Sequence, residues 1–136
     1  MTAHYHAVVW IDHHEARIFH FNADEVERLV LHPHDPTSHI HHKANSIGSG
    51  HAAEDQDFLH EVATAIADAG AVLITGPANA KTELVKYVHR HDPKMIERLP
   101  GIETVDHPTD PSLIAHARHY FKSADRMQPI EISSVI

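Results

Sequence analysis

The sequence contains no cysteine, and this absence excludes a disulfide framework, a thiolate metal site and a cysteine nucleophile. No segment approaches the roughly 20 consecutive apolar residues that a membrane-spanning helix needs, and the first residues lack the features of a secretory signal. Basic residues are scarce, 11 against 19 acidic ones, and the formal net charge of −8 argues against bulk attraction to nucleic acid. These absences favour a cytoplasmic protein that neither binds DNA nor enters a membrane.

Histidine, in contrast, is abundant, with 17 copies among 136 residues. Because imidazole ordinarily titrates near pH 6.5, half-protonation of these side chains would nearly cancel the acidic excess, in agreement with a sequence pI of about 6.1. Solubility or self-association is therefore expected to change steeply between pH 7 and pH 6. The length and a hydrophobic content of 42% fit one globular domain with a core.

The first third of the chain has the patterns of strands. Residues 6–11 form an apolar run typical of a strand buried on both faces, residues 17–21 alternate, and residues 26–31 complete an antiparallel meander. Residues 32–51 have no regular period and are predicted to form a long loop, a kind of segment that often carries function.

Beyond this loop the chain alternates predicted helices and strands. In order, these are a helix from Ala52 to Gly70, a strand over 71–75, a helix capped by Asn79 and ending at His91, a strand over 102–105 and a helix opened by Asp110 and Pro111. The order β-β-β-α-β-α-β-α predicts an α/β fold with a ribonuclease H-like mixed sheet, in a single domain over residues 1–126. Residues 127–136 form an apolar-polar tail, predicted to be a strand or an arm, which favours a homodimer.

A nuclease of such a fold would need several carboxylates at strand and helix ends to hold two divalent metals. Asp12 follows the first strand, and Glu54 or Glu61 on the first helix would add a second ligand. The strand over 71–75 and its turn offer no acid, so the sequence favours turn and surface roles for these carboxylates.

The segment from Gly76 to Thr82 superficially resembles a phosphate-binding P-loop. It is one residue too short, and alanine stands where the second glycine belongs. Main-chain amides at a helix start can still hold an anion, which makes Gly76, Asn79 and Lys81 candidates for an anion site. A turn with a helix cap explains the same residues without any ligand.

Closely spaced histidines raise the question of a metal. His39, His41 and His42 in the long loop are the candidate ligands, and imidazole suits Zn, Ni or Cu. A defined site needs a third ligand held by outer hydrogen-bond partners, and such pairs arise readily by chance in so histidine-rich a chain. The sequence therefore predicts no resident cofactor, with these metals as the alternative.

Three segments spread over roughly residues 5–124 form a pattern, and they are VVWIDHHEARIFHF, LITGPANAKTEL and IETVDHPTD. The first is a strand that ends in Asp before a turn and E-A-x-I, and the second is a strand and small-residue turn before Lys-Thr-Glu-Leu. The chain resembles the middle domain of archaeal and eukaryotic class 1 peptide release factors and of Pelota, and especially stand-alone bacterial relatives described as translational machinery proteins.

In release factors, the loop before the first helix carries Gly-Gly-Gln and promotes peptidyl-tRNA hydrolysis on the ribosome. The corresponding residues 46–51 contain glycines with no glutamine directly after them, and Gln56 lies too deep in the helix start to be its equivalent. The codon-reading domain has no counterpart in this chain. The resemblance therefore implies a non-catalytic translation-associated factor that binds ribosome or tRNA through residues 39–51. The expected contact residues are Lys43, Gly48, Ser49, Gly50 and His51.

Two other functions remain open on the sequence. One is a histidine-rich metal-binding or pH-responsive protein. The other is a peptidyl-tRNA or ester hydrolase that uses the same loop.

Overall fold

The computed structural model describes residues 5–33 and 47–135, with side chains described for 5–33 and 56–123. The elements are β1 (His6–Ile11), β2 (Ala16–Phe21), β3 (Val26–Leu31), α2 (Ile47–Ala65), β4 (Ala71–Gly76), α3 (Ala80–His91), the 3-10 helix η1 (Pro93–Arg98), β5 (Gly101–Thr104) and α4 (Asp110–Val135). No described helix is both long enough and apolar enough to cross a membrane.

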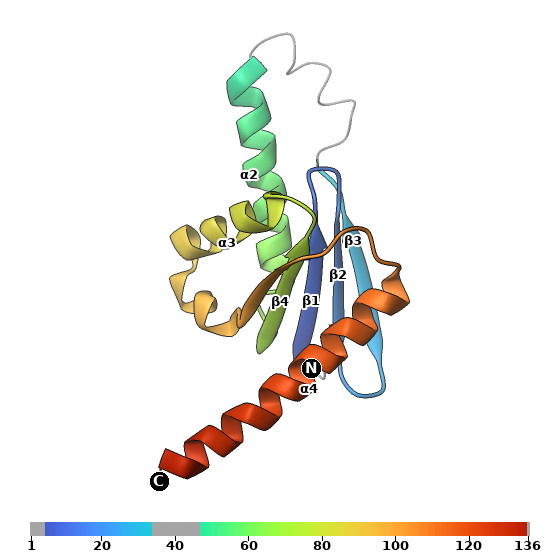
Figure 1. Cartoon of the computed structure of the whole chain (residues 1–136). Coiled ribbons are helices and arrows are strands. Elements are labelled where there is room, and N and C mark those ends of the chain that lie inside the picture. Colours follow the sequence, from blue (N-terminus) through green and yellow to red (C-terminus); the bar gives the residue numbers. More distant parts are fainter. Residues whose placement is uncertain (1–4, 34–46, 136) are drawn as a thin grey trace.

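The five strands form one mixed sheet in the order β3-β2-β1-β4-β5. Strand β2 is antiparallel to both of its neighbours, whereas β1, β4 and β5 run parallel. Helices α2 and α3 cover one face of the sheet and α4 crosses the other (Figure 1). The predicted mixed α/β architecture in a single small domain is confirmed.

Strand β1 is buried on both faces, as its apolar run predicts. Ala7, Val9 and Ile11 face the core beneath α2 and α3, while Val8 and Trp10 face α4. On the first face, Phe58, Leu59 and Val62 of α2, together with Ile66 just after it, form a stripe that is at most 5% exposed. This side of the core is closed by Leu84 and Val88 of α3 and Met95 of η1.

The second face is smaller and is covered by α4 and by the segment that leads into it, where Val105 also packs. Leu113, Ala117 and Phe121, spaced by four residues on the helix, pack on Val8, Trp10, Phe19, Phe21 and Leu73. The Trp10 indole Nε1 donates to the carbonyl of Asp106 at 2.7 Å, so the segment leading into α4 is held by a buried side chain of the central strand.

A cluster of charged side chains connects the start of α4 to strands β2 and β3. Arg17 Nη1 lies 2.6 Å from Asp110 Oδ1, and Arg28 Nε lies 2.8 Å from Asp110 Oδ2. Partial burial alone would raise the pKa of Asp110, but the hydrogen bonds and positive charges of Arg17 and Arg28 prevail and lower it. The Arg17 guanidinium also lies over Trp10, 4.6 Å from the ring centroid.

The boundaries of β2, β4 and β5 differ from the predictions by one residue, and those of the helices differ more. Helix α2 ends at Ala65, where a helix up to Gly70 was expected. Helix α2 begins at Ile47, so residues 47–51 belong to a helix and not to the long loop. The backbone of residues 127–135 continues α4 where a strand or an arm was expected. A 3-10 helix, η1, follows Pro93, and it was not predicted because its six residues are too few to show a period.

Candidate functional site

The carboxyl ends of β1, β3, β4 and β5 lie at the same end of the sheet, and four connections begin there, one of them residues 105–109 between β5 and α4 (Figure 1). The β1–β2 turn occupies residues 12–15, the β4–α3 turn occupies residues 77–79, and the chain leaves β3 here to return as α2. In open α/β sheets, ligands bind at the carboxyl ends of the strands. We call this region the carboxyl end of the sheet.

The Asp12 side chain stabilises the β1–β2 turn in which it lies. Its Oδ1 accepts the amides of His14 at 2.8 Å and Glu15 at 2.9 Å, and the Asp12 amide donates to the Glu15 carbonyl. Asn22 uses its side chain in the same way in the next hairpin. This arrangement supports the turn role expected for Asp12, as opposed to a role as a metal ligand.

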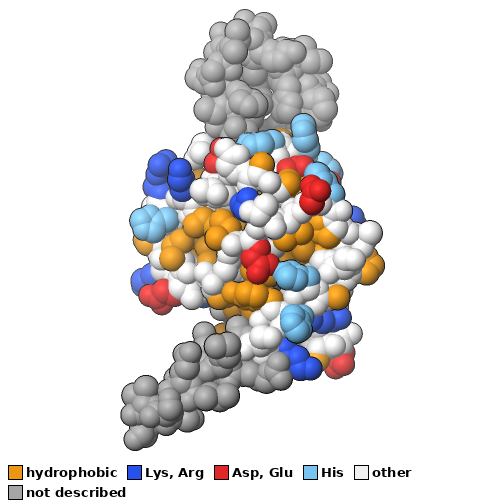
Figure 2. All heavy atoms as spheres, viewed as in Figure 1, with side chains coloured by type: hydrophobic (Ala, Val, Ile, Leu, Met, Phe, Trp, Pro, Cys, Tyr) orange, Lys and Arg blue, Asp and Glu red, His pale blue; other side chains and the backbone are white. Residues whose placement is uncertain are grey.

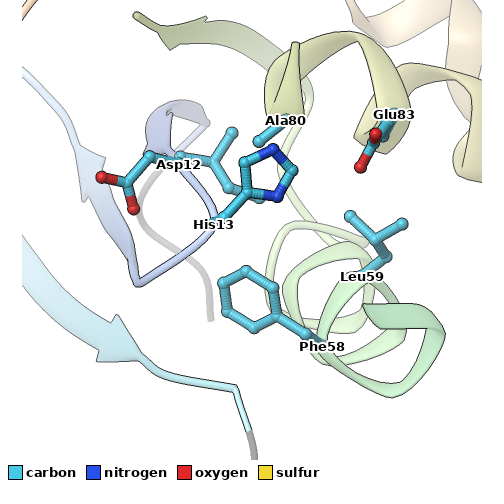
Figure 3. A pocket seen from close by; sticks show the side chains of 7 residues that line it. Asp12, His13, Phe58, Leu59, Ala80 and Glu83 are labelled. Atoms are coloured by element: carbon cyan, nitrogen blue, oxygen red, sulfur yellow. The ribbon is translucent and has the colours of Figure 1, made fainter. Parts of the chain in front are cut away.

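A small pocket lies between this turn and the two helices (Figure 3). Its lining consists of Ile11, Asp12, His13, Phe58, Leu59, Ala80 and Glu83. The His13 imidazole lies between Ala80 and Phe58, and the Asp12 carboxylate points away from the other labelled side chains (Figure 3). A volume of about 10 Å³ accommodates roughly one water molecule. The pocket is therefore too small to enclose a substrate.

The three candidate anion ligands lie in or beside the turn after β4. A Cβ on Gly76 would come 2.3 Å from the Ile11 carbonyl oxygen, so close packing of β4 on β1 explains this glycine without a ligand. Asn79 precedes α3 and forms no side-chain cap, contrary to the sequence-based expectation. The Lys81 ammonium donates to the carbonyl of Ala78. An anion at this turn stays a prediction.

Helix α2 extends beyond the carboxyl end of the sheet (Figure 1). Its first buried side chain in the described part is Phe58, seven residues after His51, which corresponds to a rise of about 10 Å along the axis. The backbone of Gly48, Ser49, Gly50 and His51 therefore lies in the helical turns farthest from the core. Lys43 lies outside the described residues.

The metal candidates His39, His41 and His42 also lie outside the described residues. Within the described part of the chain, no three His, Asp or Glu side chains lie close enough together to hold a metal ion. His32, the first residue of the predicted loop, lies in the described part of the chain, and its Nε2 lies 3.8 Å from Glu15 Oε1. A metal site involving the loop histidines stays a prediction.

One surface was missed by the sequence analysis. A groove between α3 and η1 is lined by Val85, Lys86, His89, Arg90 and Ile96. The signal was present in the charge distribution, because residues 80–98 carry five of the 11 basic residues, namely Lys81, Lys86, Arg90, Lys94 and Arg98. Averaging the charge over the whole chain conceals this concentration.

Comparison with solved structures identifies proteins of the same fold. Archaeoglobus fulgidus Pelota matches with a TM-score of 0.58 and 14% identity, over 93% of this chain and 37% of that protein. An archaeal translation termination factor matches with a TM-score of 0.54 and 17% identity, over 96% of this chain and 41% of that factor. The chain thus spans about two fifths of the length of each. No family model and no curated protein matches the sequence.

The likeness to these structures establishes a shared fold, in agreement with the resemblance found in the sequence. At an identity of 14% and 17%, this likeness assigns no role to any single residue of the chain. The two matched structures nevertheless cover nearly the whole of this chain, 93% and 96% of its length.

Proposed function

We propose that this protein is a non-catalytic translation-associated factor of the cytoplasm, which contacts the ribosome or a tRNA through residues 39–51. The observation that carries the proposal is the fold shared with Pelota and a translation termination factor over more than nine tenths of this chain. We also infer that the fold is ribonuclease H-like; the order β3-β2-β1-β4-β5 with one antiparallel strand, β2, supports this.

The position of the candidate residues supports the same function. Gly48, Ser49, Gly50 and His51 lie in the turns of α2 farthest from its buried stripe, where a large RNA surface would reach them without disturbing the core. The small pocket at the carboxyl end of the sheet leaves no room for a substrate, which favours binding over catalysis at that point.

Cosedimentation of the untagged protein with ribosomes tests this proposal. Binding is expected at low salt and also at moderate salt. Gly48→Leu and Gly50→Leu should each weaken it by an order of magnitude or so, because a bulky side chain blocks close approach of the helix start. Both variants should keep the melting temperature, since these residues precede the packed part of α2.

Thr64→Leu is the matched control, because Thr64 is an exposed and uncharged residue on the packed part of the same helix. It should bind ribosomes like the wild type. Absence of wild-type binding at both salt concentrations would contradict the proposal. If Gly48→Leu, Gly50→Leu and Thr64→Leu all bind ribosomes equally well, the start of α2 does not form the contact.

A further inference from the structure

The groove between α3 and η1 combines an apolar floor with a cationic rim. Val85 and Ile96 are half-buried and pack against the core, while Lys86, His89 and Arg90 are exposed around them. Its volume of about 390 Å³ is far larger than that of the pocket beside Asp12. Figure 2 shows Lys, Arg and His side chains around apolar atoms on the side where α3 and η1 lie. We call this region the basic groove.

The cations of the basic groove are not neutralised within the described part of the chain. No ion pair joins Lys86 or Arg90 to a described carboxylate, and the same holds for the exposed Lys94 on η1. By contrast, the guanidinium groups of Arg17 and Arg28 share the carboxylate of Asp110. A chain with a net charge of −8 thus places on one surface several cations that have no carboxylate partner among the described residues.

Packing fixes the helix that carries these charges. Lys86 and Arg90 are four residues apart on α3, so their side chains leave the same face of the helix. Leu84 and Val88 of the same helix are at most 1% exposed and hold that helix on the core. Two cations on one face of a helix suit a chain of regularly spaced negative charges, because the helix already orders the backbone and only the side-chain rotamers must be ordered on binding.

We propose that the basic groove binds the phosphate backbone of RNA, as a second contact beside residues 39–51. This inference rests on the proposed function, which supplies an RNA-rich partner. Phosphate contacts by Lys and Arg position a protein on nucleic acid without reading its sequence. An acidic protein segment is less well matched, because the floor offers only two half-buried aliphatic side chains and no deep pocket for an anchor.

Fluorescence anisotropy with a labelled oligouridine tests the groove directly on the full chain. Lys86→Glu and Arg90→Glu should each weaken binding about tenfold at low salt, and should reduce the slope of log K against log salt by about 0.7 to 1. Oligoadenosine should show the same losses. The matched control is Lys122→Glu, an exposed site on α4 that changes the net charge equally on the opposite face of the sheet.

Several outcomes would overturn the proposal. The first is that the wild type does not bind oligouridine. The second is that Lys86→Glu, Arg90→Glu and Lys122→Glu weaken binding equally. The third is that a polyglutamate peptide binds more tightly than oligouridine and depends on Lys86 and Arg90. The last result would assign the groove to an acidic protein partner. Melting curves confirm that each variant is folded.

Ribosome cosedimentation of the same proteins separates this proposal from the proposed function. If the wild type fails to sediment with ribosomes, the proposed function is wrong, whatever the oligonucleotide result. If the wild type sediments and Lys86→Glu and Arg90→Glu behave like Lys122→Glu in both assays, the groove proposal alone is wrong.

Discussion

Gly76 and Gly101 lie in neighbouring parallel strands but differ in what surrounds their missing side chains. A Cβ on Gly76 would come 2.3 Å from a main-chain oxygen of β1, which cannot move without disrupting the sheet. We predict that Gly76→Ala lowers the free energy of unfolding by about 1–3 kcal/mol, as overpacking does. Urea unfolding measures the change.

Gly101→Ala is the comparison variant. The nearest atom to its Cβ would be the Tyr120 hydroxyl oxygen at 2.5 Å, the far end of a side chain that can rotate away. It should therefore cost less than Gly76→Ala. An equal cost at the two positions would show that the contact with β1 is not what requires glycine at position 76.

Asp110 provides a prediction that depends on pH. Its pKa is lower in the folded state, so it stabilises the fold fully above its unfolded pKa of about 3.9, and this stabilisation is lost as pH falls through the lower folded value. Asp110→Asn should lower the free energy of unfolding by about 1–2 kcal/mol at pH 7. The difference from wild type should shrink below about pH 4.

Urea titrations at several pH values make this measurement. Asp68→Asn, at an exposed position on the loop after α2, serves as the control and should differ little from wild type at any pH. A loss from Asp110→Asn that is the same at pH 7 and pH 3 would mean that the ion pairs with Arg17 and Arg28 contribute nothing to stability.

At the scale of elements, the starts of α3 and α4 differ in whether a side chain caps them. Thr109 precedes α4, and its Oγ1 accepts the Ser112 amide at 3.3 Å, whereas Asn79 precedes α3 without a side-chain cap. We predict that Thr109→Ala costs about 1 kcal/mol in the free energy of unfolding, and that Asn79→Ala costs less than half as much. Thermal or urea unfolding of the two variants makes the comparison. The reverse ranking would contradict the structure.

The sequence predicted the strands better than the helix ends. Strands β1 and β3 begin and end where the sequence patterns predict, although β1 is buried and β3, at the edge of the sheet, has its first four residues exposed. The cap before α4 was assigned to Asp110, but Thr109 forms it, since the Asp110 carboxylate is engaged by Arg17 and Arg28. No local pattern reveals a contact between residues 93 positions apart, such as that between Arg17 and Asp110.

The start of α2 was missed for a related reason. Gly48, Ser49 and Gly50 have low helix propensity, and a reading based on local preference ends the loop only at Ala52. In the structure the helix continues through all three residues. Local propensity describes what a segment prefers alone, and it cannot show that an anchored helix continues past the sheet.

At the scale of the whole molecule, the order of elements constrained the topology well. A meander followed by alternating helices and strands leaves few ways to form one sheet with helices on both faces. The basic groove was not predictable in this way, because it depends on η1 packing beside α3 and bringing Ile96 next to Val85. Surfaces that join two elements require the tertiary arrangement.

The histidine content predicts how the solubility of the whole molecule depends on pH. The net charge of −8 should approach zero near pH 6.1 as the 17 histidines gain protons. Solubility should therefore pass through a minimum close to that pH and recover on either side. Dynamic light scattering between pH 7.5 and pH 5 measures this association.

Circular dichroism over the same pH range separates association from unfolding. The fold should persist at pH 6, because the ion pairs of Asp110 lose their stabilisation only as the pH falls below about 4. Replacing four exposed histidines, His13, His14, His89 and His107, by glutamine should move the minimum to lower pH, since fewer protons are gained near neutrality. A minimum that does not move would mean that carboxylates, and not histidines, govern the association.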